Sequence, residues 1–150
     1  PPDKTGNFGG IGLHGAPADA KIEGSINVPA YAFDGFWEEQ KAPDNCTLIK
    51  MDVEGHELPA LKGMEKFLKR ERPILYVEND RKEKSADLMK YISGLDYDLF
   101  WHTPKLYERR NYFDSTDNVF GNIVSINLFC APKERPVTAD FARRFNLQVC

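Results

Sequence analysis

The sequence of 150 residues lacks the features of several large protein classes. Its three cysteines, Cys46, Cys130 and Cys150, are widely spaced and form no CxxC pair. This pattern fits neither a disulfide framework nor a zinc site, and we expect free thiols in a reducing cytoplasm. No apolar run approaches the roughly 18 residues that span a membrane, and no signal peptide is visible. We therefore expect a cytoplasmic protein that does not bind membranes.

An excess of basic residues is also missing. The chain has 20 Lys and Arg residues against 23 Asp and Glu residues, which gives a formal net charge of -3. Nucleic acid binding requires a basic surface, so nucleic acid is not the expected partner. The densest basic group, in residues 66–72, lies at the end of a predicted helix, where cations interact well with the helix dipole. With 41% hydrophobic residues, the chain can bury the core of one domain.

A glycine-rich phosphate loop between a strand and a helix is the third missing feature. The main glycine cluster, residues 7–13, has neither a clear strand before it nor a helix after it, so it does not fit a dinucleotide loop. We expect a loop and a short edge strand there, and a weak strand over residues 22–28. A short helix is predicted over residues 30–40, with three aromatic residues facing the core: Phe33, Phe36 and Trp37.

The clearest pattern begins at Thr47. An apolar strand over residues 47–51 stops at Asp52 and Glu54, and a helix is predicted directly afterwards, over residues 57–70. Ligands of open α/β sheets bind outside the carboxyl ends of the strands. The pattern therefore predicts an enzyme in which Asp52 and Glu54 stand at the active site.

The rest of the chain predicts an α/β sheet with a terminal hairpin. Two apolar strands joined by a helix predict a parallel sheet that is buried on both faces, and two later strands without a helix between them predict an antiparallel hairpin. The long aromatic loop at residues 102–122 is interpreted as a lid or substrate loop, or alternatively as a packed structural loop. The predicted elements are strands at 74–77, 97–101 and 123–130, a helix capped by Ser85 and ending at Ser93, and a helix at 139–145.

Several segments together resemble a known family. They are residues 49–57 (IKMDVEGHE), 61–63 (LKG), 72–81 (RPILYVENDR), 97–102 (YDLFWH), 111–113 (NYF) and 127–130 (NLFC). This set is similar to the FkbM family of S-adenosylmethionine-dependent methyltransferases, over roughly residues 7–131. The resemblance implies a seven-stranded class I methyltransferase sheet, which is Rossmann-like, with parallel strands finished by an antiparallel hairpin. It also implies S-adenosyl-L-methionine as cofactor and methyl transfer to a hydroxyl of a sugar or secondary metabolite.

The family's glycine-rich cofactor loop has no counterpart that we recognise in this chain. We therefore expect residues 1–131 to be the C-terminal part of an FkbM-like domain, and residues 132–150 to be a terminal extension. Such a fragment would expose an apolar sheet edge, so we expect the isolated chain to self-associate. The alternative to an enzyme is a non-catalytic module that binds a carbohydrate or a partner through its aromatic loop.

The resemblance places Asp52 where it faces the cofactor and the small-molecule or glycan acceptor. A carboxylate there can take the proton of the acceptor hydroxyl, although a carboxylate near a helix N-terminus is also stabilised by the dipole. Glu54 has the same two interpretations, with capping a stronger competitor. His102, at the end of a later strand, is a second candidate for proton transfer because imidazole titrates near neutrality. A hydrogen-bonded structural histidine is the competing interpretation.

Four further residues are candidates for substrate binding. Glu78 and Asn79 end the strand beside that of Asp52 and are expected to line the same cleft, or else to anchor a loop. Asn111 and Tyr112 belong to the long aromatic loop. A metal site formed by Asp52, Glu54 and His56 would need an extended backbone, which Gly55 interrupts, so we assign no metal.

Overall fold

The computed structural model describes residues 27–40 and 45–150. In these ranges the chain forms a mixed α/β domain with one five-stranded sheet. Its helices are α1 (Phe33–Gln40), α2 (Glu57–Lys62), α3 (Glu65–Glu71), α4 (Lys82–Gly94) and α5 (Ala139–Arg144). Its strands are β1 (Leu48–Met51), β2 (Ile74–Glu78), β3 (Tyr97–His102), β4 (Asn127–Pro132) and β5 (Gln148–Val149). None of the helices described here is long and apolar enough to cross a membrane.

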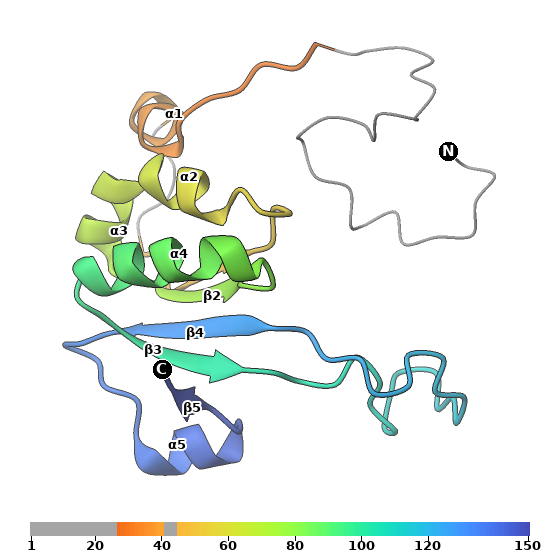
Figure 1. Cartoon of the computed structure of the whole chain (residues 1–150). Helices are drawn as coiled ribbons and strands as arrows, with labels where there is room; N and C mark the ends of the chain where they lie inside the picture. Colours follow the sequence, from red (N-terminus) through yellow and green to blue (C-terminus); the bar gives the residue numbers. More distant parts are fainter. Residues whose placement is uncertain (1–26, 41–44) are drawn as a thin grey trace.

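The sheet combines one parallel pair with antiparallel strands, in the order β1-β2-β4-β3-β5. Figure 1 shows β2, β4, β3 and β5 of this order. β1 and β2 are parallel and are connected by α2 and α3, as the sequence predicted. The hairpin of β3 and β4 is antiparallel, which confirms the second prediction, and β4 lies between β2 and β3. The short strand β5 was not predicted, and it pairs with the outer edge of β3.

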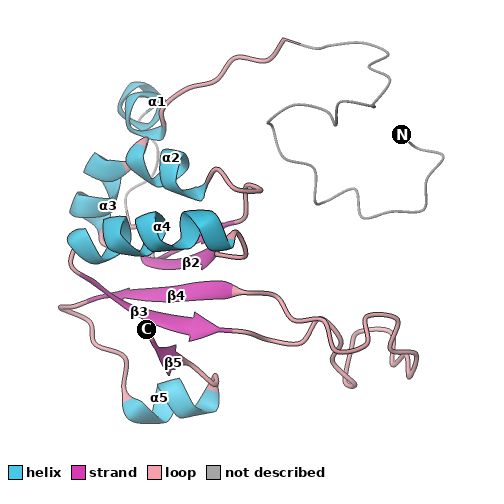
Figure 2. Ribbon diagram, in the orientation of Figure 1, coloured by secondary structure: helices cyan, strands magenta, loops and turns pink. Residues whose placement is uncertain are grey.

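The helices divide unequally between the two faces of the sheet. Helices α1 to α4 lie on one side, whereas α5 lies on the other (Figure 2). The face towards α2, α3 and α4 is the core, and Leu75, Val77, Leu128 and Cys130 of β2 and β4 are fully buried there. The prediction that both faces are buried was wrong for β1, because Leu48 is 58% exposed. No described strand pairs with the outer edge of β1.

The predicted continuous helix over residues 57–70 is in fact two helices, α2 and α3. The break lies at Gly63, whose carbonyl accepts a hydrogen bond from the backbone N–H of Asp34 in α1 (2.9 Å). The Asp34 carboxylate then accepts bonds from the N–H groups of Lys66 and Phe67, each at 2.9 Å. A side chain from another helix therefore caps α3, and this long-range contact is invisible to local periodicity.

Two other helix predictions need correction. α1 begins at Phe33 rather than Ala30, and its Phe36 is 47% exposed, whereas Trp37 is buried and Phe33 packs partly against the core. α4 begins at Lys82, so Ser85 lies inside the helix and does not cap it. The Ser85 hydroxyl instead accepts a hydrogen bond from the Asn79 side chain (2.9 Å).

The predicted strand at 123–130 starts later, at Asn127, and ends at Pro132. The residues before it belong to an arm, residues 103–126, that extends away from the sheet between β3 and β4 (Figure 1). One isolated bridge, between Lys105 and Val124, joins the two sides of the arm near its base. The glycine cluster at 7–13 and nearly all of the predicted strand at 22–28 lie outside the described residues.

The C-terminal segment packs on the sheet through α5 and β5. The predicted helix is confirmed as Ala139–Arg144, with the Thr138 hydroxyl accepting a hydrogen bond from the N–H of Phe141 (3.2 Å). Phe141 contacts Phe129 of β4, with ring centroids 5.7 Å apart. Arg72, in the basic group that the sequence placed at a helix end, donates from Nε and Nη2 to the two carboxylate oxygens of Glu134, at 2.7 and 2.9 Å.

Candidate functional site

A row of polar side chains crosses the sheet where β1, β2 and β3 end. Glu78 of β2 is directly opposite Asn127 of β4, and Asn127 is directly opposite His102 of β3. Because Met51 is paired with Val77, Asp52 follows at the level of Glu78. Residues directly opposite one another share a face of the sheet. The register therefore sets Asp52, Glu78, Asn127 and His102 in one line, on the face away from α4.

The row has a definite length. Neighbouring strands lie about 4.8 Å apart, so Asp52 and His102, which are three strand spacings apart, are separated by roughly 14 Å at the backbone. Asp52 and Glu78 are direct neighbours. The two residues that the sequence offered for proton transfer, Asp52 and His102, thus stand at opposite ends of the row.

Three carboxylates gather at the Asp52 end. Oxygen atoms of Asp52, Glu54 and Glu78 lie within 4.8 Å of one another. Carboxylate oxygens are the ligands of Mg²⁺ and Ca²⁺, so these three side chains are the ones that can hold a divalent cation here. The set differs from the one considered from sequence, because Glu78 takes the place of His56. The His56 Nδ1 atom lies instead 3.3 Å from the carbonyl oxygen of Val53.

The surroundings of Glu78 raise its pKa. Burial, followed by the contact with the Asp52 carboxyl group and the nearby charges of Asp80 and Glu54, raises the pKa of Glu78 to about 7. Its Oε2 atom is buried and has no hydrogen-bond partner within the described ranges.

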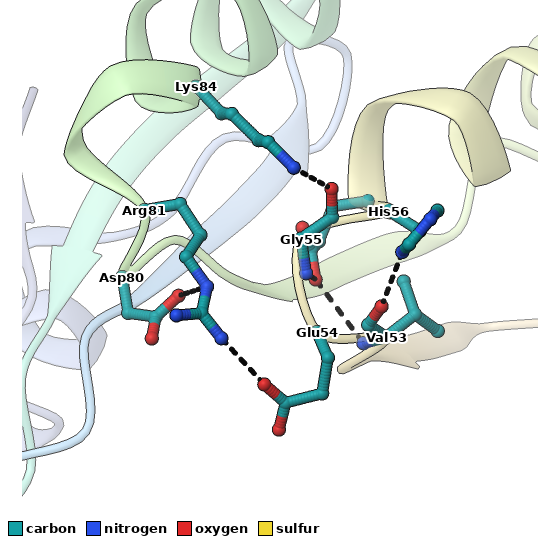
Figure 3. A network of polar contacts seen from close by, with 8 residues as sticks. Val53, Glu54, Gly55, His56, Asp80, Arg81 and Lys84 are labelled. Carbon is teal, nitrogen blue, oxygen red and sulfur yellow. Dashed lines mark hydrogen bonds and ion pairs between the residues drawn. The ribbon is translucent and has the colours of Figure 1, made fainter. Parts of the chain in front are cut away.

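Glu54 and Gly55 form a strained turn between β1 and α2. Both have positive φ angles, 52° for Glu54 and 87° for Gly55. The Glu54 carboxylate is 2.7 Å from Arg81, and Lys84 donates a hydrogen bond to the Gly55 carbonyl (2.8 Å; Figure 3). Asp80 also pairs with Arg81, at 3.3 Å. The turns after β1 and β2 are therefore tied together by cations from the start of α4.

The buried side chains of Glu57 and Asn79 stabilise these turns by hydrogen bonds. Glu57 is buried, and its carboxylate accepts hydrogen bonds from the backbone N–H groups of Val53 (3.2 Å) and Gly55 (3.0 Å). Asn79 is 6% exposed, and its side chain donates to Ser85. The Asn79 side chain is thus directed into the fold, which matches the loop-anchoring interpretation of this residue.

His102 is engaged with a residue that the sequence did not single out. Its Nδ1 atom lies 2.7 Å from the hydroxyl of Tyr76, and both side chains are partly buried. Burial lowers the pKa of His102, so the neutral imidazole is favoured. Lys50 lies 5.6 Å from the centre of the Tyr76 ring and pairs with Asp52 at 3.2 Å. Lys50 and Tyr76 lie directly opposite each other, on the same face of the sheet and two residues before Asp52 and Glu78.

Comparison with protein families identifies the chain. Residues 4–99 match the methyltransferase FkbM domain, and this range includes Asp52, Glu54 and Glu78. The chain belongs to the FkbM methyltransferase family. Neither the curated proteins nor the solved structures give a significant match to it. The family resemblance inferred from the strand ends is therefore confirmed, and the polar row is the methyltransferase's candidate site.

The arm of this FkbM chain holds the last two predicted residues. Asn111 binds within its own loop: its amide nitrogen donates to the carbonyls of Glu108 (3.0 Å) and Ser115 (2.8 Å). Its amide oxygen accepts from the N–H groups of Phe113 (3.2 Å) and Ser115 (3.1 Å). Tyr112, next in the chain, is 94% exposed. In this structure Asn111 therefore shapes the loop, while Tyr112 is presented to solvent.

Sequence reasoning missed three members of the site, namely Asn127, Tyr76 and Lys50. Asn127 is only 2% exposed, and its amide donates to Ser125 (2.8 Å). A polar residue at the start of an otherwise apolar strand can indicate a site residue. The predicted strand began at Ile123, which put Asn127 in its interior, so this indication was missed. Lys50 and Tyr76 interrupt apolar strands at alternate positions, which is the pattern of a face that is not fully packed.

Proposed function

We propose that this FkbM chain takes part in S-adenosyl-L-methionine-dependent O-methylation of a small-molecule or glycan hydroxyl. The observation that supports it is the polar row at the carboxyl ends of β1 and β2, where α/β enzymes bind their ligands. In a methyltransferase a ligand at this edge needs groups that orient a hydroxyl and remove its proton. Asp52 and Glu78 are suited to both tasks.

The residues of the cluster suit the positively charged sulfur of the proposed cofactor. When bound, S-adenosylmethionine supplies an electrophilic methyl group on a positively charged sulfur. The carboxylates of Asp52, Glu54 and Glu78, within 4.8 Å of one another, would supply negative charge that stabilises such a cation nearby. Asp52 would face both the cofactor and the acceptor. Glu78 would contact the acceptor, and His102, at the other end of the row, would contact a more distant part of it.

Calorimetric titration of the purified chain with S-adenosylhomocysteine tests this function first. Micromolar binding that is weakened in Asp52→Asn but not in Asp87→Asn, an exposed change on α4, supports the proposal. A folded sample that binds nothing contradicts cofactor binding by this chain.

Transfer of labelled methyl groups from S-adenosylmethionine to a set of methyl glycosides then tests the chemistry. If Asp52→Asn leaves turnover unchanged, Asp52 has no part in the mechanism.

The alternative function, a binding module without catalysis, is favoured by the arm alone. Tyr112 and Phe113 are 94% and 84% exposed, and their rings contact each other with centroids 5.1 Å apart. Exposed aromatic rings are typical of surfaces that bind a partner or a carbohydrate. Glycan binding that is lost in a Tyr112→Ser, Phe113→Ser variant and is independent of S-adenosylhomocysteine supports this alternative over the enzyme.

We also propose that the isolated chain self-associates through β1. The outer edge of this strand has no partner in the described part of the chain, and Leu48 is 58% exposed beside it. Unpaired edges with apolar side chains pair with other chains. Light scattering of the wild type should give a mass above that of the monomer, and Leu48→Lys should reduce it. A monomeric wild type contradicts the proposal.

A further inference from the structure

Tyr76 and His102 form a hydrogen bond over the strand that separates them. Tyr76 lies on β2 opposite Phe129 of β4, whereas His102 lies on β3 opposite Asn127, two residues earlier on β4. The Tyr76 hydroxyl oxygen nevertheless lies 2.7 Å from Nδ1 of His102, so the contact passes diagonally over β4, on the face that carries the polar row. Because β2 and β3 are not neighbours in the sheet, this bond fixes the orientation of the His102 ring beyond what strand pairing does.

The proton in this bond belongs to the tyrosine. Bonds from O–H donors are commonly about 2.7–2.8 Å long and those from N–H donors about 2.9–3.0 Å, so the 2.7 Å separation fits donation by the hydroxyl. Imidazole is also more basic than a phenol, with reference pKa values of about 6.5 and 10, so the nitrogen is the better acceptor. If Nδ1 donated instead, the hydroxyl proton and the lone pair of Nε2 would both need other partners, and the described residues provide neither.

Both side chains are held in the neutral state that this bond requires. Burial raises the pKa of the Tyr76 hydroxyl above its ordinary value of 10.0, and burial lowers the pKa of His102 below 6.5. The hydroxyl therefore keeps its proton at neutral pH, and the imidazole is uncharged. When Nδ1 does take up a proton, the hydroxyl can turn and accept a hydrogen bond from it. The bond persists in both charge states, so burial remains the cause of the lowered pKa of His102.

The second ring nitrogen of His102 is the group that remains for a ligand. A neutral imidazole carries one proton, so an Nδ1 atom that accepts a hydrogen bond leaves this proton on Nε2. Nε2 lies beyond Cε1 from Nδ1, so its N–H is directed away from Tyr76, and in residues 27–40 and 45–150 it has no hydrogen-bond partner. His102 is the last residue of β3 and is partly exposed, at the edge of the sheet where α/β proteins bind ligands.

We infer that Tyr76 is a positioning residue that fixes His102 as the tautomer with its proton on Nε2, and that this N–H donates a hydrogen bond to an oxygen of the methyl acceptor. The ligand contact rests on the proposed O-methyltransferase function, whereas the tautomer follows from the Tyr76–His102 pair alone. His102 is then a hydrogen-bond donor and not a second proton acceptor, so proton removal stays at the Asp52 end of the row. A hydroxyl, ether or carbonyl oxygen suits this donor, and an ammonium group does not.

The tautomer is tested by long-range ¹H–¹⁵N NMR of the imidazole rings in the whole chain, about two pH units above the ordinary pKa of 6.5. The His102 signals are assigned by their loss in His102→Gln. They should show a proton on Nε2 and none on Nδ1, and Tyr76→Phe, which removes only the hydroxyl, should shift the Nδ1 signal. His56, whose Nδ1 lies beside the Val53 carbonyl, is the control that should not respond. A proton on Nδ1 of His102 in the wild type, or an Nδ1 signal unchanged in Tyr76→Phe, overturns the inference.

The ligand contact is tested by methyl transfer from S-adenosylmethionine to the methyl glycosides that the wild type accepts. The side-chain amide of glutamine can replace Nε2–H as a donor but cannot take up a proton, whereas leucine can do neither. His102→Leu should lower kcat/KM by roughly 2–10-fold, the effect of one neutral hydrogen bond, and His102→Gln should recover most of this loss. Equal losses in the two variants, or no loss in His102→Leu, overturn the donor role and leave the proposed function standing. No transfer by the wild type overturns the function and the ligand contact together, while the NMR spectra still decide the tautomer.

Discussion

The two faces of the sheet are made from alternate residues of the same strands, yet they differ in what covers them. On the face towards α2, α3 and α4, Leu75, Val77 and Leu128 are completely buried. On the other face, Ile74 and Tyr76 alternate with these residues and are only partly buried. The packed face supplies stability, which frees the opposite face to carry polar and ionisable groups. Successive residues of a strand point to opposite faces, so a core residue and a residue of the candidate site can be direct neighbours in the sequence.

The largest expected difference between the faces is in stability. Leu75→Ala should lower the free energy of unfolding by about 2–5 kcal/mol, because it leaves a cavity in the packed core. Ile74→Ala, which removes a side chain of the same size from the next position of β2, should cost only about 1 kcal/mol. Urea unfolding with an unchanged m-value measures both. Equal losses in the two variants would mean that the faces are equally packed.

The packed face was also the easier one to predict from sequence. Leu61, Leu68, Leu88 and Ile92 follow helical spacing, and all are buried. Continuous apolar runs likewise predicted β1 and most of β2. The break between α2 and α3 was missed because it depends on Asp34, which is 32 residues away from Lys66 in sequence. Local patterns record which side of a helix is apolar, but they do not record a cap that comes from another helix.

The helix caps on the two faces allow a second, smaller comparison. Asp34 caps α3 with two hydrogen bonds, one of them to the partly buried N–H of Phe67. Thr138 caps α5 on the other face with one exposed bond. Asp34→Ala should cost about 1–2 kcal/mol, and Thr138→Ala about 0.5 kcal/mol. Thermal unfolding of the two variants measures this difference, and a larger loss for Thr138→Ala would contradict the unequal roles of the two helical layers.

The candidate site was predicted in part, and the limit is again geometric. Acids at the ends of two strands were recognisable, so Asp52, Glu54 and Glu78 were chosen correctly as neighbours. The sequence did not predict that β4 lies between β2 and β3, which separates His102 from Glu78 by a strand. Strand order is a property of the whole sheet, whereas motifs describe one strand end at a time.

The smallest expected effect is on the pKa of His102. It tests whether burial on the polar face is the cause of the lowered pKa. Burial lowers the pKa of His102, so the native protein binds fewer protons there than the unfolded chain. Stability from this group is therefore present above the ordinary value of 6.5 and is lost as the pH falls below it. Tyr76→Phe keeps the ring that covers His102 and should keep the pKa low, whereas Tyr76→Ala removes the cover and should raise it towards 6.5. Imidazole NMR signals measure both midpoints against the urea-unfolded chain. A midpoint raised as much by Tyr76→Phe as by Tyr76→Ala would assign the shift to the 2.7 Å hydrogen bond rather than to burial.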